Sequence, residues 1–192
     1  MKPSTVFLSF LFGVFLLTWT GCADADAPAE GDMTADTMAT TPPQDTRPMA
    51  TVQLQPTQGN QASGSLTFSQ DGATVRVSGT IRGLTPGTHG FHVHQTGDCS
   101  APDASSAGGH YAPQGSPHGA PSAPPGQRHV GDLGNIEAGQ DGMAVVSISD
   151  SLLALSGPNS IVGKAVIVHA SADDLTSQPS GDAGPRVACG VI

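Results

Sequence analysis

The chain has 192 residues, with 16 acidic and 7 basic side chains and a formal net charge of −9 at pH 7. This acidic balance argues against nucleic acid or an anionic surface as a partner. Residues 51–192 have the length of one domain and are numerous enough to bury a hydrophobic core.

The first residues have the pattern of an export signal. Lys2 is followed by an almost uninterrupted apolar run over 6–17, which is too short to span a bilayer. The small residues before Cys22 resemble the cleavage box of a bacterial lipoprotein, in which the cysteine becomes the acylated first residue. We therefore predict a signal peptide over 1–21, a lipid anchor at Cys22, and export to the cell envelope or periplasm. The alternative is an ordinary cleaved signal that leaves Cys22 unmodified.

Residues 22–50 consist mostly of Ala, Asp, Thr, Pro and Met, without branched aliphatic or aromatic side chains. Such a segment cannot bury enough apolar surface to offset its chain entropy, so we predict a disordered tether between a membrane and the domain. Three methionines offer thioethers for Cu(I), but composition alone also explains them. They are Met33, Met38 and Met49.

The domain predicted over 51–192 has a hydrophobic period of two residues. Leu66 and Phe68 alternate with polar neighbours, and Val75 and Val77 do the same after a turn, which predicts a hairpin. No stretch has a helical hydrophobic stripe. The pattern predicts an all-β fold, a Greek-key sandwich or barrel of about eight antiparallel strands. Further strands are expected at 89–95, 130–137, 143–149 and 161–169.

The stretch Gly90-Phe91-His92-Val93-His94 combines a strand pattern with two metal-ligand side chains. Alternate side chains of a strand share a face, so His92 and His94 point the same way. Phe91 and Val93 then point into the opposite layer. Two imidazoles on a rigid strand form half of a metal site, and other histidines of the chain can complete it.

A long stretch over 96–127 contains no predicted strand and is crowded with Gly and Pro. A structureless loop of this length inside a compact domain is uncommon, and it is usually either disordered or functional. His110 and His118 lie within it, and His129 and Asp132 follow directly. These side chains favour function, because a bound metal supplies the ordering that a hydrophobic core cannot supply here.

The chain has three cysteines. If Cys22 carries lipid, Cys99 and Cys189 remain as an even pair in an oxidising compartment. We expect these two residues to form a disulfide, and a free pair is the alternative.

Five separated segments resemble, in order, the signature segments of the copper/zinc superoxide dismutases. The resemblance extends from about residue 51 to the C-terminus, and several motifs in the right order are far more specific than one. This family has a β-sandwich fold. The segments are His92-Val93-His94, Ser106-Ala107-Gly108-Gly109-His110, Arg128-His129-Val130-Gly131-Asp132-Leu133-Gly134-Asn135, Val168-His169-Ala170-Ser171-Ala172-Asp173-Asp174 and Gly184-Pro185-Arg186-Val187-Ala188-Cys189-Gly190-Val191.

The resemblance implies a copper site and a zinc site that share one bridging histidine. The implied copper ligands are His92, His94, His110 and His169. The implied zinc ligands are His110, His118, His129 and Asp132. Imidazole suits both metals, and three nitrogens with one carboxylate suit tetrahedral zinc. The remaining histidine, His89, is interpreted as structural, with its ring hydrogen-bonded near the site.

The resemblance also assigns roles around the metals. Asp173 would link His92 to His118 by hydrogen bonds and so fix the tautomers of both rings. Arg186 would anchor the superoxide anion beside the copper. His110 would take a proton when the copper is reduced.

The implied reaction is the dismutation of superoxide to dioxygen and hydrogen peroxide by one-electron cycling of the copper, with zinc in a structural role. A copper-binding or copper-delivering protein of the same fold with little turnover is a second hypothesis, and a purely structural β domain is a third. Loss of a ligand or of the arginine would favour copper delivery, and neither loss is seen.

The stretch 170–185 departs from many relatives because it contains no lysine to attract the anion. Weaker electrostatic steering of superoxide is therefore expected. The sequence pattern leaves the oligomeric state open, with a homodimer as one option.

Overall fold

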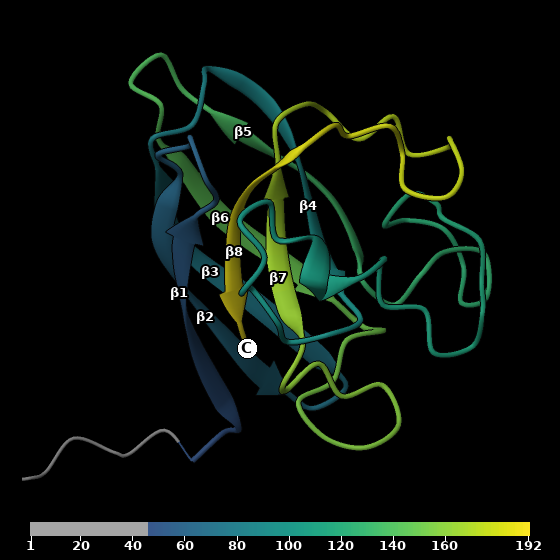
Figure 1. The fold of residues 1–192 in the computed structure, drawn as a ribbon. Helices are drawn as coiled ribbons and strands as arrows, with labels where there is room; N and C mark the ends of the chain where they lie inside the picture. Colours follow the sequence, from purple (N-terminus) through teal and green to yellow (C-terminus); the bar gives the residue numbers. More distant parts are fainter. Residues whose placement is uncertain (1–45) are drawn as a thin grey trace, which may run out of the picture. The chain divides into compact units, whose positions relative to one another are not determined.

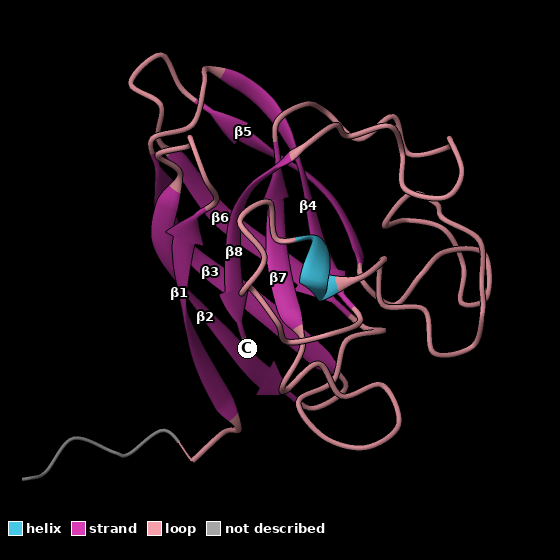
Figure 2. Ribbon diagram, in the orientation of Figure 1, coloured by secondary structure: helices cyan, strands magenta, loops and turns pink. Residues whose placement is uncertain are grey.

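The computed structural model describes residues 46–192, which form an all-β domain (Figure 1). The predicted signal peptide, Cys22 and the tether up to residue 45 lie outside the described residues. None of the described residues belongs to a helix long and apolar enough to cross a membrane. The strands are β1 (Met49–Pro56), β2 (Ser63–Asp71), β3 (Thr74–Arg82), β4 (Gly87–His94), β5 (Asp132–Ala138), β6 (Ala144–Asp150), β7 (Ala165–His169) and β8 (Arg186–Val191). Figure 2 shows these strands and a short 3-10 helix, Ser105–Ala107.

The eight strands form one antiparallel sheet in the order β5-β4-β7-β8-β1-β2-β3-β6. Strands β1, β2 and β3 pair consecutively, whereas β4 pairs with β5 on one side and with β7 on the other. The two end strands, β5 and β6, also contact each other, so the sheet curls into a nearly closed barrel. The predicted all-β Greek-key class is therefore confirmed.

Strands β2 and β3 form the predicted hairpin. Phe68 pairs with Val77 and Leu66 pairs with Gly79, and the three apolar side chains are buried. The two-residue turn begins with Gly72, whose φ of +59° lies in the left-handed region that glycine adopts without steric penalty. The alternation of apolar and polar residues thus builds one wall of the hydrophobic core.

Strands β1, β7 and β8 depart most from the sequence-based expectations. The sequence pattern did not locate β1 or β8, and β1 begins at Met49, ahead of residue 51, because Met49 pairs with Ser69. Strand β7 is shorter than the predicted range 161–169. The chain turns before it, with Gly163 at φ +78° and the Lys164 N–H donating to the Ile161 carbonyl at 3.0 Å.

The long loop after β4 packs against the outer face of the barrel. Val166 and Val168 of β7 belong to the main core, whereas Ile167 points outward and packs against Ala104 and Ala107 of the loop. A disulfide joins Cys99 of the loop to Cys189 of β8, with Cα atoms 5.8 Å apart. The predicted disulfide is therefore confirmed, and it holds the loop against β7 and β8.

Two loops cover the outer face of β4 and β7. The first loop consists of residues 95–131, and the second loop consists of residues 170–185. Figure 1 shows both on the same flank of the barrel, and hydrogen bonds between His118 and the second loop place them side by side. Histidines on this face are therefore enclosed by loops instead of being exposed to solvent.

Candidate metal centre

Strand β4 provides the first two side chains of the site. His92 and His94 lie on one face of β4 and are buried, while Phe91 and Val93 fill the barrel core. Because β4 is hydrogen-bonded to β5 and β7, its backbone is fixed on both sides. The strand therefore holds two imidazoles at a set spacing, as the alternation predicts.

Neighbouring strands and the long loop bring further ligand-type residues to the same face. His169 ends β7 and Asp132 begins β5, the two strands that pair with β4. His110 forms an isolated β-bridge with His94. The loop before β5 contributes the remaining histidines, His118 and His129.

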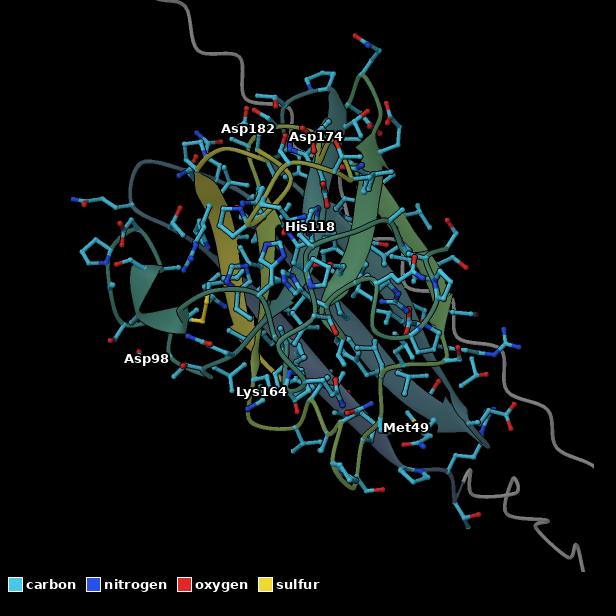
Figure 3. All side chains as sticks on the ribbon, turned by 90° about the vertical axis from the view of Figure 1, so that its right-hand side faces the viewer. Met49, Asp98, His118, Lys164, Asp174 and Asp182 are labelled. Carbon is cyan, nitrogen blue, oxygen red and sulfur yellow. A yellow bond between two sulfur atoms is a disulfide. The ribbon has the colours of Figure 1, made fainter. Side chains whose placement is uncertain are left out.

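These side chains form two groups that could each hold a metal ion, and the ligand atoms within a group lie within 4.8 Å of one another. The first group is His92, His94, His110 and His169. The second group is His110, His118, His129 and Asp132. His110 belongs to both, so the two groups adjoin each other. Figure 3 views this side of the molecule, with His118 near the centre.

In the first group each ring has one nitrogen without a hydrogen-bond partner. Buried polar atoms are normally hydrogen-bonded, so four unpaired nitrogens gathered in one place indicate a metal site. Four imidazoles suit copper. The unpaired atoms are Nδ1 of His92 and Nε2 of His94, His110 and His169.

The opposite ring nitrogens hold the imidazoles in place. Nδ1 of His94 donates to the Gly108 carbonyl at 2.9 Å, and Nδ1 of His169 donates to the Gly184 carbonyl at 3.0 Å. Burial, with the charge of neighbouring groups, lowers the pKa of His94 to about 2 and that of His169 to about 3. Both rings are therefore neutral near pH 7, with the lone pair on the nitrogen that faces the group.

The second group is arranged around the carboxylate of Asp132. Its Oδ1 lies 2.8–3.1 Å from Nδ1 of each of the three histidines, His110, His118 and His129. Its Oδ2 accepts the backbone N–H of His129 at 2.9 Å and that of Gly119 at 3.0 Å. Three nitrogens and one carboxylate oxygen in such close contact match the donor set of tetrahedral zinc.

The charge of the second group favours a cation. Burial alone would raise the pKa of Asp132, but hydrogen bonds from the histidines and Gly119 outweigh burial and hold it well below its usual range. Burial has the opposite effect on a histidine and would lower the pKa of His118. Hydrogen bonds to Asp132 and Asp173 outweigh burial and raise it to about 9. The carboxylates of Asp132 and Asp173 therefore stabilise a positive charge on or between the neighbouring rings. A metal ion can supply that charge.

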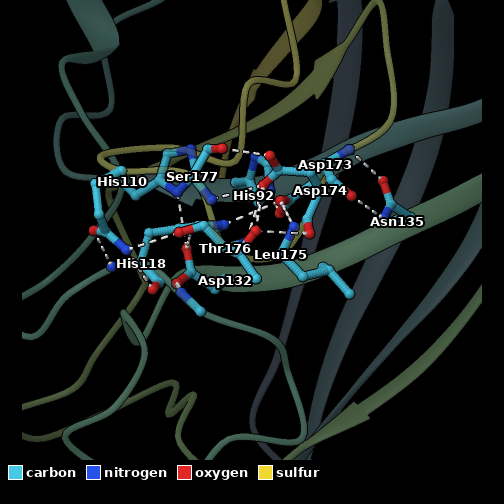
Figure 4. Close-up of polar contacts among 12 residues, drawn as sticks. His92, His110, His118, Asp132, Asn135, Asp173, Asp174, Leu175, Thr176 and Ser177 are labelled. Atoms are coloured by element: carbon cyan, nitrogen blue, oxygen red, sulfur yellow. Dashed lines mark hydrogen bonds and ion pairs between the residues drawn. The ribbon is translucent and has the colours of Figure 1, made fainter.

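Asp173 connects the two groups (Figure 4). Its Oδ2 accepts Nε2–H of His92 at 2.7 Å, and its Oδ1 accepts Nε2–H of His118 at 3.0 Å. Asn135 holds the Asp173 backbone in turn, by accepting its N–H at 2.8 Å and donating to its carbonyl at 2.9 Å. The bridge leaves Nδ1 of each histidine ring free for a metal.

His89 lies outside both groups. Its Nδ1 is 2.7 Å from the His169 carbonyl and its Nε2 is 2.8 Å from the Thr85 carbonyl. With both ring nitrogens occupied by backbone oxygens, His89 ties the turn before β4 to the end of β7. This arrangement matches the structural role expected for it.

Arg186 lies at a cavity that opens onto the site. The cavity is lined by His94, His110 and His169 as well as by Ser180, and Arg186 is the only Lys or Arg among its lining residues. The guanidinium donates to the carbonyls of Ala104 and Gly108 in the long loop. The cation is thereby fixed beside the first group.

Sequence reasoning missed the residues that support the ligands from behind. Arg128 donates to the carbonyls of His129 and Asp132 and forms a buried ion pair with Asp150 at the end of β6. Arg128 stands beside His129 in a recognisable motif, which is a usable signal. Asn135 ends the same motif and shares that signal. Asp150 had no predicted role, because its partner Arg128 is 22 positions away in the sequence.

The fold and the site define a class of protein: a β-barrel with two adjoining metal groups, one suited to copper and one to zinc, that share a histidine. The family model for copper/zinc superoxide dismutase matches residues 62–192. A superoxide dismutase [Cu-Zn] from Onchocerca volvulus is 46% identical over 155 residues, covering 75% of this chain and 96% of that protein. A crystal structure of the clock protein EA4 matches with a TM-score of 0.69 and 40% identity, covering 76% of this chain and 94% of that one.

The chain belongs to the copper/zinc superoxide dismutase family. It is an enzyme that converts superoxide to dioxygen and hydrogen peroxide, with copper and zinc as cofactors. The expected reaction and cofactors are confirmed, and copper delivery without turnover is not favoured.

Proposed function

We propose that the two groups divide between the two metals. In this proposal the four-histidine group holds the catalytic copper, and the group around Asp132 holds a structural zinc. The observation that carries it is the set of buried, unpaired ring nitrogens, which hydrogen bonding leaves unexplained. His110 joins the groups, because its Nε2 belongs to the unpaired set while its Nδ1 lies 2.8 Å from Asp132.

Copper held by His92, His94, His110 and His169 would supply one-electron redox chemistry for superoxide. The protein's part is to bind and orient the anion and to supply a proton. Arg186 has five N–H donors, of which the carbonyls of Ala104 and Gly108 occupy only two, so others can hold superoxide in the cavity. His110 lines the same cavity, and its unpaired Nε2 can hold one of the two protons that hydrogen peroxide needs, the other coming from solvent.

Metal content measured with activity tests the division. We expect His169→Ala to lose copper and turnover while it keeps zinc, because His169 belongs only to the first group. We expect His118→Ala to lose zinc first, because it belongs only to the second. Loss of the same metal from both variants would contradict the division.

We also infer that the enzyme works outside the cytoplasm on a lipid anchor. The apolar run over 6–17, the small residues before Cys22 and the polar segment that follows support this inference. The disulfide between Cys99 and Cys189 fits an oxidising compartment. Labelling of cells with a palmitate analogue tests it: label is expected on the chain and absent from Cys22→Ser, and an unlabelled wild type would refute the anchor.

We further infer a homodimer through an apolar patch beside the C-terminus. Val162 and Val191 are 52% and 45% exposed, and both adjoin the same surface, where Gly97 approaches Gly163 and Val191. Exposed apolar side chains beside one another suit an interface between two copies of the chain. Sedimentation should give a dimer for the wild type and a monomer for Val162→Asp, and an identical mass for both would exclude this patch.

A further inference from the structure

The second loop contains a segment that is braced by its own hydrogen bonds. The Asp174 N–H donates to the Gly181 carbonyl at 2.8 Å, and the Gly181 N–H donates to the Ser177 carbonyl at 2.7 Å. The Asp174 carboxylate also accepts the backbone N–H groups of Thr176 and Ser177 at 2.9 and 2.7 Å. We call residues 174–181 the latch segment, and these internal hydrogen bonds give it a defined shape.

The side chain of Gln178 extends from this segment to the backbone of His118. Its Oε1 accepts the His118 N–H at 2.9 Å, and its Nε2 donates to the His118 carbonyl at 2.9 Å. Nε2 also donates to the Thr176 carbonyl at 3.2 Å, which fixes the amide against its own segment. One glutamine side chain therefore satisfies both backbone polar groups of a single buried residue.

The same loop also holds the ring of His118. Oδ1 of Asp173 accepts its Nε2–H at 3.0 Å, directly before the latch segment. Gly181 closes over this hydrogen bond: a Cβ placed there would lie 1.7 Å from Oδ1 of Asp173 and 2.7 Å from Nε2 of His118. Glycine alone fits such a close approach at φ +69°.

The backbone of His118 has little other support. It lies in a Pro- and Gly-rich part of the long loop where the described structure has no strand or helix. Its neighbour Gly119 donates to Asp132, but the hydrogen bonds that the structure shows for the His118 backbone itself are those with Gln178. Without them, the residue would regain backbone freedom that zinc binding would have to remove again.

We propose that Gln178 is a positioning residue for zinc, which holds the backbone of His118 so that its Nδ1 stays directed at the zinc group. The proposal rests on the assignment of His118 as a zinc ligand. The second loop, which has no lysine, then has a function of its own. It helps to retain zinc through the uncharged amide of Gln178, which bonds to the His118 backbone.

The test measures the release of zinc from fully metal-loaded protein to an excess of a chelator. Gln178→Ala removes both hydrogen bonds, and Gln178→Glu places a carboxylate against the His118 carbonyl. We expect both variants to release zinc about tenfold faster than wild type, as groups that orient metal ligands typically do when lost. The matched control is Gln114→Ala, since Gln114 is an exposed glutamine of the long loop that bonds to Asn159 away from the zinc group.

A spectroscopic readout separates positioning from general loosening of the fold. Co²⁺ bound in the zinc position should give a changed visible spectrum in Gln178→Ala and an unchanged one in Gln114→Ala, because its absorption reports ligand geometry. Unfolding of the metal-free proteins in urea should be the same for the two variants. Zinc release and cobalt spectra equal to those of the control would overturn the proposal.

His118→Ala distinguishes the two levels of inference. If it binds zinc as tightly as wild type, the ligand assignment is wrong and the role of Gln178 falls with it. If it loses zinc while both Gln178 variants behave like Gln114→Ala, the ligand assignment stands and the role of Gln178 is refuted.

Discussion

At the scale of single residues, the site histidines divide their ring nitrogens between structure and metal. His94 and His169 each donate one N–H to a backbone carbonyl, and His92 donates to Asp173. The second nitrogen of each ring is buried without a partner. The hydrogen bonds thus select the tautomer that can bind a metal, and Asp173 does this for two rings at once.

Asp173→Asn should weaken zinc binding about 10- to 100-fold, because an amide cannot accept hydrogen bonds from His92 and His118 with both of its heavy atoms. Zinc affinity by competition with a chelator measures the change. Asp182→Asn is the matched control, since Asp182 is an exposed acid of the same loop whose φ of +51° suits asparagine. Equal zinc affinity in the two variants would contradict the bridging role.

The metal-free protein should gain stability as the pH rises from about 4 to about 6.5. The pKa values of His94, His110 and His169 are lowered to about 2, 4 and 3, mainly by burial, so the unfolded chain binds more protons in this range. The raised pKa of His118, about 9, acts in the opposite direction: its stabilisation is lost as the pH rises from about 6.5 through 9. Urea unfolding with the disulfide intact should therefore give a maximum near pH 6.5, and a free energy of unfolding that falls between pH 4 and 6.5 would contradict this.

At the scale of elements, the strands set ligand positions and buried polar contacts hold the loops to them. Strand β4 fixes its two histidines because both of its edges are paired. The loop that leads into β5 is held from behind by Arg128, whose partner Asp150 ends β6 and accepts the N–H groups of Leu152 and Leu153. The ion pair of Arg128 and Asp150 thus connects the zinc group to β6, which stands at the other end of the strand order from β5.

Asp150→Ala should destabilise the protein by about 3–5 kcal/mol, because it leaves the buried Arg128 without a counter-charge. Urea unfolding of the disulfide-bonded protein measures the loss. Asp71→Ala is the contrast: the pair of Arg47 and Asp71 is 47% and 60% exposed, so its loss should change stability by at most about 1 kcal/mol. Similar losses in both variants would show that burial does not govern the Arg128 pair.

Sequence reasoning located the parts of the fold and site that carry local periodicity or a motif. The hairpin of β2 and β3 and the two histidines of β4 follow from alternation. The long loop indicated His110, His118, His129 and Asp132 as further candidates. The family resemblance added His169 and the division of the ligands between copper and zinc. Strand β1 escaped prediction because only Val52 and Leu54 of it are buried, between exposed polar residues. Gln178 escaped because it contacts the backbone of a residue 60 positions away, and no pattern of residue types marks such a contact.

At the scale of the whole molecule, an acidic protein must attract an anion. The formal net charge is −9, and Arg186 is the only Lys or Arg among the lining residues of the cavity. A net negative charge gives a long-range field that does not favour the approach of superoxide. Binding should therefore depend on short-range contacts, which superoxide makes with Arg186 and the metal group once it is inside the cavity.

Ser180→Lys should raise kcat/KM for superoxide several-fold at low ionic strength, because it adds a second cation to the cavity lining. The gain should shrink as salt is added, since about 0.1 M salt screens charges beyond roughly 10 Å. Val145→Lys adds the same charge at a position that is 71% exposed and outside the cavity lining. An equal gain in both variants would show that net charge, and not the cavity, limits the rate.

The shared histidine is the central claim, and one measurement on His110→Ala tests it most directly. Copper and zinc are quantified together with dismutation activity on the same samples of wild type and variant. Because His110 belongs to both groups, we expect about one copper and one zinc per chain in the wild type, with both metals bound more weakly and turnover lost in the variant. A variant that lost only one metal, or kept both at wild-type occupancy, would contradict a histidine shared between the two sites.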